Sequence, residues 1–312
     1  MVLEIIKGLF GRRHRLPRDQ VTRLPRAVRK ATEPQVAAIQ AALDEIAALP
    51  ALADIALNKK APKGFYAAAE RFAAAYDAYV EEVARLLGLQ SATRPGTPEG
   101  HRGCYEQPCP VSGVEGLLIY RKVRPWADFR QVAEQLARLG EAQFKEIQGR
   151  HTGKDAEQIA MTSAAVTDGR LAFAQRGEPC PFLDGETRRC RIWDVRPFVC
   201  RMHFNAGDPE WSDPRHASFK KMVAKNIRLP VRQQLALMQI EKRMMLQAAP
   251  FLNATVLQLL QFAEGQTIPE AGDAPTKFAA DGQPAPKANR NVPHAKKFQK
   301  EKAKAKEKKR KK

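Results

Sequence analysis

Three cysteines spaced ten residues apart are the residues of this chain best suited to chemistry. They are Cys180, Cys190 and Cys200, and their spacing does not produce a stripe of core residues on a helix or a strand. It suits three turns that converge on one point, and Pro181 and Pro197 restrict the backbone beside the cysteines. Because thiolates bind soft metals, this pattern predicts a bound metal ion or iron–sulfur cluster.

The residues around these cysteines favour ligation over simple burial. Arginine follows two of the cysteines directly and is frequent nearby, at positions Arg188, Arg189, Arg191, Arg196 and Arg201. Positive charge lowers the pKa of a neighbouring thiol, so we expect these arginines to favour the thiolate. Asp184-Gly185 predicts a turn between the first two cysteines. The alternative interpretation is three buried structural cysteines.

A closed site needs a fourth ligand, and two further cysteines are the candidates. Cys104 and Cys109 stand in a stretch rich in Gly, Pro and Thr between residues 91 and 116, which predicts an irregular loop. The predicted metal ligands are therefore Cys104, Cys109, Cys180, Cys190 and Cys200, with one of them left over. His203 is an alternative fourth ligand, whereas His101 and His151 are weaker candidates.

The stretch from residue 180 to residue 204 resembles the YkgJ-type cysteine-cluster family, which is described as zinc- or iron-chelating. The family pattern runs Cys-Pro-Phe-Leu, Cys-x-Ile-Tyr, Arg-Pro and Cys-Arg-x-Phe. The matching positions here are Cys180-Pro181-Phe182-Leu183, Cys190-Arg191-Ile192-Trp193, Arg196-Pro197 and Cys200-Arg201-Met202-His203-Phe204. Several positions besides the cysteines agree, so the resemblance implies a zinc ion or an iron–sulfur cluster held by this segment.

The resemblance extends over residues 100–205. At the N-terminal end of this range the sequence differs from the family pattern. There the family usually has a dense group of cysteines that ends in an adjacent pair, whereas this sequence has only Cys104 and Cys109. Thiolates suit both zinc and iron–sulfur clusters, and the long loop spacings favour the cluster slightly. The flagellin lysine-N-methylases have similar cysteine motifs and an iron–sulfur cluster. This distant resemblance implies an alternative function, an iron–sulfur enzyme that acts on a protein or an RNA by redox chemistry or methyl transfer.

Nothing in the sequence predicts export or insertion into a membrane. The apolar first ten residues are interrupted by Glu4 and Lys7 and lack the apolar core and cleavage site of a secretory signal. No apolar run reaches the roughly 18 residues that a membrane span requires. We therefore expect a cytoplasmic protein, in which five cysteines, an odd number, stay reduced rather than form a disulfide framework.

The net charge of +19 is concentrated in two terminal arms. Residues 1–30 contain nine Lys or Arg against two acids, and residues 296–312, from Lys296 to Lys312, contain eleven against two. Only three of the net positive charges belong to the body between them. Such arms predict contact with a polyanion, here nucleic acid or the ribosome, and the apolar start of the first arm also suits an anionic membrane surface.

Motifs of other functions are absent or incomplete. Residues 149–155 read Gly-Arg-His-Thr-Gly-Lys-Asp, which is one residue shorter than a phosphate-binding loop and ends in Asp where Ser or Thr should bind magnesium. The sequence contains no nucleophile elbow, zinc-protease motif or dinucleotide fingerprint. An enzyme built on this sequence would therefore have to work through the metal centre.

The elements that must position the cysteines are mainly helices. Apolar residues recur at helical spacing from residue 34 to 46, along 64–87 with Gly88 as a C-terminal cap, along 126–147 and from 231 to 262. Further helices are expected from residue 52, around 156–165 and through Phe219 and Ile227. The run 117–120 suits a strand or the start of a helix, and Leu171 to Gln175 has the alternation of a strand.

The predicted fold is mainly α: a helical domain with an irregular, loop-rich cysteine-cluster subdomain and little β structure. We divide the chain into a basic N-terminal arm (1–33), a helical segment (34–90), a cysteine-cluster metal-binding region (91–213), C-terminal helices (214–265) and a disordered basic tail (266–312). The function predicted for the whole is a cysteine-cluster metal-binding protein with basic termini.

Overall fold

The computed structural model describes residues 18–20, 24–91, 104, 111–150, 164–205, 208, 211, 213–221, 224–246, 251–278 and 284. Its α-helices are α2 (Arg26–Ala31), α3 (Glu33–Ala48), α4 (Asp54–Asn58), α5 (Phe65–Leu87), α6 (Gly113–Val123), α7 (Phe129–Gln148), α8 (Ala164–Gln175), α9 (Phe198–Arg201), α10 (Val231–Met244) and α11 (Leu252–Phe262). Two short 3-10 helices, η2 (Trp193–Val195) and η4 (Phe219–Lys221), accompany them. The prediction of a mainly α fold is confirmed.

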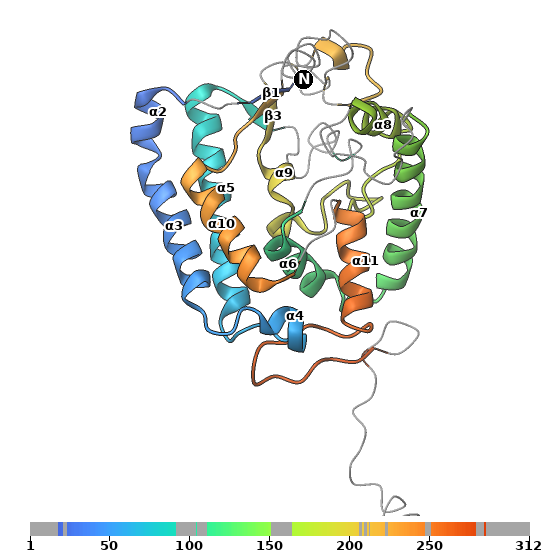
Figure 1. The fold of residues 1–312 in the computed structure, drawn as a ribbon. Coiled ribbons are helices and arrows are strands. Elements are labelled where there is room, and N and C mark those ends of the chain that lie inside the picture. The colour runs from blue at the N-terminus through green and yellow to red at the C-terminus, as the bar shows by residue number, and fades with distance from the viewer. Residues whose placement is uncertain are drawn as a thin grey trace, which may run out of the picture.

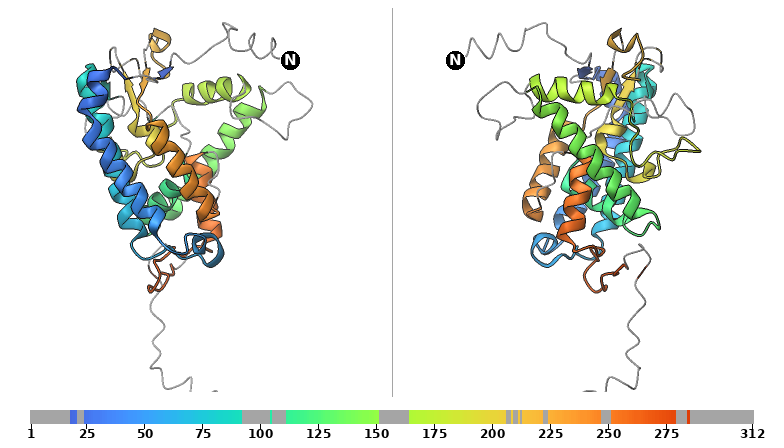
Figure 2. Two further views of the ribbon diagram at one scale, coloured as in Figure 1. Left: turned by 60° about the vertical axis from the view of Figure 1, so that its left-hand side comes forward. Right: turned by 90° about the vertical axis from the view of Figure 1, so that its right-hand side faces the viewer.

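The helices pack side by side in a continuous series. α10 lies on α3, α3 packs along α5, and α5 contacts the central α6 (Figure 1). On the other side of α6 follow α11, α7 and α8, and the turned views show the same two groups of helices on either side of the centre (Figure 2). The cysteine segment descends between the two groups, with α9 near the middle of the molecule (Figure 1).

The predicted pattern of α5 is confirmed in the structure. Its aromatic stripe is buried, including Phe65, Phe72 and Tyr76, and Gly88 ends the helix in the left-handed conformation at φ 65°, as a C-terminal glycine allows. Its alanines let α3 approach closely, since small side chains shorten the distance between helices. The resulting α3–α5 pair forms one wall of the core.

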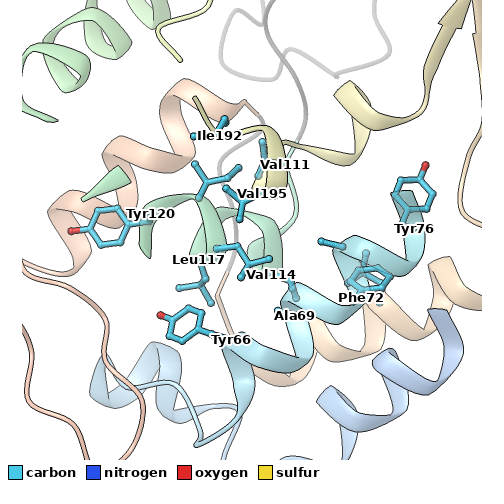
Figure 3. Packing of buried hydrophobic residues seen from close by; sticks show 14 of the residues in the cluster. Tyr66, Ala69, Phe72, Tyr76, Val111, Val114, Leu117, Tyr120, Ile192 and Val195 are labelled. Atoms are coloured by element: carbon cyan, nitrogen blue, oxygen red, sulfur yellow. The ribbon is translucent and has the colours of Figure 1, made fainter. Parts of the chain in front are cut away.

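The central helix α6 is buried on almost every side, unlike the amphipathic helices around it. Its N-terminus is held by a capping box: Ser112 accepts a hydrogen bond from the Glu115 N–H, and the Glu115 carboxylate accepts one from the Ser112 N–H. Figure 3 shows Val114 and Leu117 of α6 packed between α5 and the segment that follows Cys190. The run 117–120, for which strand and helix were both open, is therefore helical.

A small four-stranded sheet closes one end of the molecule. Its strands are β1 (Arg18–Gln20), β2 (Gln90–Ser91), β3 (His203–Asn205) and β4 (Ala224–Asn226), in the order β1-β4-β3-β2. β4 pairs parallel with β1 and antiparallel with β3, and β3 pairs antiparallel with β2. Because β3 follows α9 directly, the sheet anchors the cysteine segment at its C-terminal side.

Two predicted elements differ from the structure. The strand expected at residues 171–175 is wrong, because these residues complete α8, which packs against α7. The helix expected through Phe219 and Ile227 is also wrong: η4 covers 219–221, and residues 224–226 pair with β3 as β4. In both places packing with a distant segment overrides the local pattern.

A strap, residues 264–278, crosses the foot of the helices below α4 (Figure 1). Glu270 in the strap accepts hydrogen bonds from the N–H groups of Gly64 and Tyr66 at the start of α5, each at 3.0 Å. The Tyr66 hydroxyl donates to the Ile268 carbonyl at 2.7 Å, and Arg124 donates to the Gly265 carbonyl. The sequence placed the disordered tail from residue 266 onward, whereas these backbone groups hold the chain as far as residue 278 against α5 and α6.

Several predictions fall outside the described residues, namely the apolar start of the N-terminal arm, the helix expected around 156–163 and the basic tail from 285 onward. Within the N-terminal arm, residues 26–31 form α2. None of the helices that the structure describes has the length and apolar character to cross a membrane.

Two helix glycines provide a test of the α7–α8–α11 packing. A Cβ at Gly169 in α8 would lie 2.6 Å from the Ile147 Cα of α7, whereas a Cβ at Gly140 in α7 would have only the Asn253 Cβ nearby, at 3.8 Å. We expect Gly169→Ala to lower the free energy of unfolding by about 1–2 kcal/mol, because overpacking exceeds the gain in helix propensity. Gly140→Ala should raise it by up to about 1 kcal/mol. Urea denaturation measures both variants. If both substitutions change the free energy of unfolding in the same direction, the close α7–α8 contact would be contradicted.

Candidate metal centre

The first two cysteines are joined by a tight hairpin. Leu183 and Cys190 pair as an antiparallel bridge, and the Arg191 N–H donates to the Phe182 carbonyl at 2.8 Å. At its tip the Asp184 carboxylate accepts hydrogen bonds from the N–H groups of Glu186 and Thr187, which confirms the predicted turn. Cys180 and Cys190 both pack against the main core, so the hairpin holds two thiols near the interior.

Two of the three cysteines lie at local turns of the backbone. The Cys180 carbonyl accepts from the Leu183 N–H at 2.8 Å, and the Cys190 carbonyl accepts from the Trp193 N–H at 3.3 Å. Cys200 lies in α9, whose first N–H groups follow Pro197. Cys180 and Cys190 therefore lie at turns as predicted, whereas Cys200 lies within a short helix.

Apolar side chains fix the segment between Cys190 and Cys200 onto the helices. Ile192 and Val195 point towards Val114 and Leu117 of α6 (Figure 3), and both are buried. The Phe198 ring meets the rings of Phe72 and Tyr76 edge-on, each with centroids 5.0 Å apart. The segment is thus part of the core and not a surface loop.

The strongest polar contact of the segment is to Asp77 of α5. Its carboxylate pairs with Arg196 at 2.7 Å and with Arg201. The two guanidinium groups are 6% and 1% exposed, so they need a negative partner within the protein. Arg201 also donates to the carbonyls of Asp194 and Arg196, at 2.6 and 2.8 Å. This network ties the chain on both sides of Pro197 to the middle of α5.

Arg196 interacts electrostatically with two of the candidate ligands. The charge of its guanidinium interacts with the thiols of both Cys190 and Cys200. Its two terminal nitrogens donate to the Trp193 carbonyl and to Asp77, and the guanidinium stacks on the Trp193 ring at 3.5 Å. Its buried Nε has no hydrogen-bond partner within the described structure. An N–H donor of this kind suits sulfur ligands, whose properties depend on hydrogen bonds from neighbouring groups.

Glu115 connects the front of α6 to the cysteine segment. Its carboxylate accepts hydrogen bonds from the backbone N–H groups of Ser112 and Phe198. Burial raises the pKa of Glu115 to about 7, against the lowering effect of these hydrogen bonds and of the nearby Arg201 charge. The stretch that follows Cys109 and the helix that bears Cys200 therefore share one buried carboxyl group.

The predicted lowering of a thiol pKa by arginine charge is present at Cys190 but is outweighed by burial. Burial raises the pKa of its thiol, and the hydrogen bond from the Ile192 N–H and the Arg196 charge offset only part of that rise. Arg191 instead forms a bidentate pair with Asp128, at 2.6 and 2.8 Å, and stacks on Trp126 at 3.8 Å. The arginines of this segment mainly fasten the chain to the helices.

The structure brings some of the predicted ligands together and leaves others apart or undescribed. Cys190 and Cys200 share Arg196, and Cys180 is linked to Cys190 by the hairpin. Cys104 is described as half-buried, whereas Cys109 lies outside the described residues. Among the residues that the structure describes, no three His, Cys, Asp or Glu side chains form a group that could hold a metal ion, and no disulfide links two of the cysteines.

His203, the alternative fourth ligand, is buried in β3. Its Nδ1 lies 3.2 Å from the Oδ1 of Asn226, its register partner in β4. This contact gives the ring a structural role between two strands, in agreement with the interpretation that such a histidine forms hydrogen bonds near a site.

The sequence interpretation missed Asp77 altogether. Its partners lie 119 and 124 residues away in the sequence, so no local pattern connects them. The available signal was the position of a carboxylate between Tyr76 and Tyr79, two aromatic residues of the predicted core stripe. A charged residue beside such a stripe implies a buried partner of opposite charge.

A comparison with protein families agrees with the cysteine motifs. Residues 140–222 match the model of the CxxCxxCC family, described as a putative zinc- or iron-chelating domain. The predicted resemblance to a zinc- or iron-chelating cysteine-cluster family is thus confirmed. No curated protein and no solved structure matches the chain.

The match covers a narrower stretch than the resemblance predicted from the motifs. The matched range includes Cys180, Cys190 and Cys200. It begins at residue 140, after Cys104 and Cys109, and so contains neither of them. The chain also contains no Cys-x-x-Cys pair, so the cysteine spacing in the family's name does not occur here. The matched range therefore includes three of the five cysteines.

The chemistry of the donors fits a thiolate-bound centre, although the described residues do not gather a complete ligand set. Three half-buried cysteines lie in one segment, and the positive charge of the buried Arg196 interacts with two of them. Soft sulfur donors of this kind suit zinc or an iron–sulfur cluster better than hard cations. The candidate fourth ligands belong to the stretch before Ser112, most of which lies outside the described residues.

Replacing Asp77 tests the network that holds the cysteine segment. Asp77→Ala leaves two buried guanidinium groups without their carboxylate, so we expect the free energy of unfolding to fall by about 3 kcal/mol. The matched control is Glu82→Ala on the same helix, whose carboxylate pairs with Arg85 near the surface and should contribute little. Urea denaturation measures both variants. Equal losses would show that Asp77 has no special role.

Proposed function

We propose that the protein binds one zinc ion or one iron–sulfur cluster through Cys180, Cys190 and Cys200, with Cys104 or Cys109 as the fourth ligand. The observation that carries the proposal is the buried Arg196, whose positive charge interacts with Cys190 and Cys200 and whose Nε–H has no hydrogen-bond partner among the described residues. The match of residues 140–222 to a zinc- or iron-chelating family supports it.

The surrounding residues have distinct tasks in this proposal. Asp77 and Arg201 hold the backbone on both sides of Pro197, and Arg196 offers an N–H donor and a positive charge to bound thiolates. Glu115 connects the candidate fourth-ligand stretch to α9. Bound zinc would supply a structural cross-link between these segments, and a bound cluster would supply an electron-transfer centre.

We place this function in the reducing cytoplasm. There, glutathione and thioredoxin keep thiols available for metals, and the described cysteines form no disulfide with one another. A buried thiol such as Cys190, whose pKa is raised by burial, keeps its proton until a metal displaces it.

Metal and sulfide analysis of anaerobically purified protein tests the proposal. We expect one zinc ion, or iron with acid-labile sulfide, per chain, and a loss of at least about 90% of it in Cys180→Ser, Cys190→Ser and Cys200→Ser, because thiolates supply the ligand field. The presence or absence of sulfide and of visible absorption separates a cluster from zinc.

Cys104→Ser and Cys109→Ser complete this experiment. One of them should lose the metal and the other should retain it, which identifies the fourth ligand. A folded parent protein that contains neither zinc nor iron would overturn the proposal. Full metal content in Cys180→Ser, Cys190→Ser and Cys200→Ser would overturn the proposal as well.

A second candidate function is contact with a polyanion through the termini, favoured by the charge of residues 296–312, eleven Lys or Arg against two acids. We expect the intact chain to bind single-stranded RNA without sequence preference and with strong salt dependence, because bound cations release counterions. Removal of residues 296–312 should weaken binding at low salt by about tenfold or more and flatten the salt dependence.

Fluorescence anisotropy with a labelled RNA at several salt concentrations measures this effect. The control replaces residues 296–312 by a neutral Gly/Ser tail of equal length, which preserves chain length and removes charge. Affinity that is unchanged by truncation would exclude the tail as the contact.

A further inference from the structure

A groove of about 1540 Å³ lies between α2, α3 and the start of α10, away from the cysteine segment. One wall is formed by α2 and the first half of α3, and the other by residues 228–234. Gln233 of α10 donates to Gln40 of α3 at 2.9 Å and joins the two walls. The two walls come from parts of the chain that are about 200 residues apart in the sequence.

The groove concentrates positive charge that has no ion-pair partner among the residues that the structure describes. Its lining includes five basic side chains, Arg26, Arg29, Lys30, Arg228 and Arg232, against two acidic ones, Glu33 and Asp44. All five are exposed, and among the described residues none of them takes part in an ion pair or side-chain hydrogen bond. Elsewhere in the described body many arginines are paired, for example Arg71 with Glu45 and Arg191 with Asp128.

An exposed apolar stripe continues from the groove along α10. Val231, Leu235 and Met238 follow each other at helical spacing and are 74%, 53% and 57% exposed. Val231 itself lines the groove, so the apolar stripe and the basic side chains form one continuous surface. Large apolar side chains that lie together on a surface commonly mark a binding site.

We propose that this surface binds an acidic amphipathic helix of a partner protein. The occupant follows from charge complementarity, because its acidic face would meet the five unpaired cations and its apolar face would cover the stripe on α10. A helix with side chains is about 10 Å wide and rises about 1.5 Å per residue, so one turn of it covers about 5 Å of the surface.

Other occupants fit this surface less well. Nucleic acid is held by phosphate contacts and by stacking on aromatic side chains, whereas the lining contains apolar residues such as Val36 and two carboxylates, and its aromatic residue, Tyr79, is buried. An anionic membrane presents a flat surface to an amphipathic helix, whereas this surface is concave. An acidic helix uses both the shape and the charge of the groove.

Peptide binding to the intact protein tests this proposal. The probe is a fluorescein-labelled peptide about four turns long, with Leu at i, i+3, i+4 and i+7 and Glu on the other face. We expect anisotropy to show saturable binding that weakens by about tenfold or more in Arg228→Glu/Arg232→Glu and in Arg26→Glu/Arg29→Glu. Leu235→Asn should weaken binding by about fivefold, because it removes an apolar contact.

The matched control is Lys60→Glu/Lys63→Glu, which changes the net charge equally at two exposed positions beyond the far end of α3 and should leave the affinity within about twofold. A permuted peptide of the same composition should bind about tenfold more weakly. Equal binding of both peptides, or equal loss in the groove and control variants, would overturn the proposal. Binding of single-stranded RNA or anionic vesicles that depends on Arg228 and Arg232, without peptide binding, would overturn it too.

Discussion

One carboxylate on α5, Asp77, receives the guanidinium groups of Arg196 and Arg201 from the cysteine segment. Buried guanidinium groups require a negative partner, since removing charges from water is unfavourable unless they are paired and hydrogen-bonded. The chain from Trp193 to Met202 must therefore lie against the middle of α5. The position of Cys200 follows from this pairing, because Cys200 lies between the two arginines in the chain, whereas Cys190 lies three residues before Trp193.

The rest of the fold supports that contact from two sides. The aromatic face of α5 buries Phe72 and Tyr76 against Phe198, and α6 contributes the buried Glu115 that accepts the Phe198 N–H. These contacts involve arginine, carboxylate and aromatic groups and no sulfur. The cysteine segment is thus held by the protein itself, so under the proposed function metal binding would need to order less of the chain.

Electrostatic pairing also distinguishes the cysteine segment from the groove between α3 and α10. Around the cysteine segment, Arg191, Arg196 and Arg201 all have carboxylate partners, and their contribution is mainly structural. At the groove between α3 and α10 the cations lie on the surface without a carboxylate partner in the described part of the chain, beside exposed apolar residues. Paired charges maintain the shape of the protein, whereas unpaired charges remain available for an external ligand.

The sequence by itself determined the mainly α character, helices such as α3, α5 and α10, and the similarity to a zinc- or iron-chelating family. Helical periodicity is encoded within a few neighbouring residues, and the cysteine motifs are also local. Only the tertiary structure decided that residues 171–175 are helical, that residues 224–226 form a strand and that the strap reaches residue 278. It also decided that Asp77 meets arginines more than 100 residues away, because such contacts depend on which faces pack together and no local pattern records that choice.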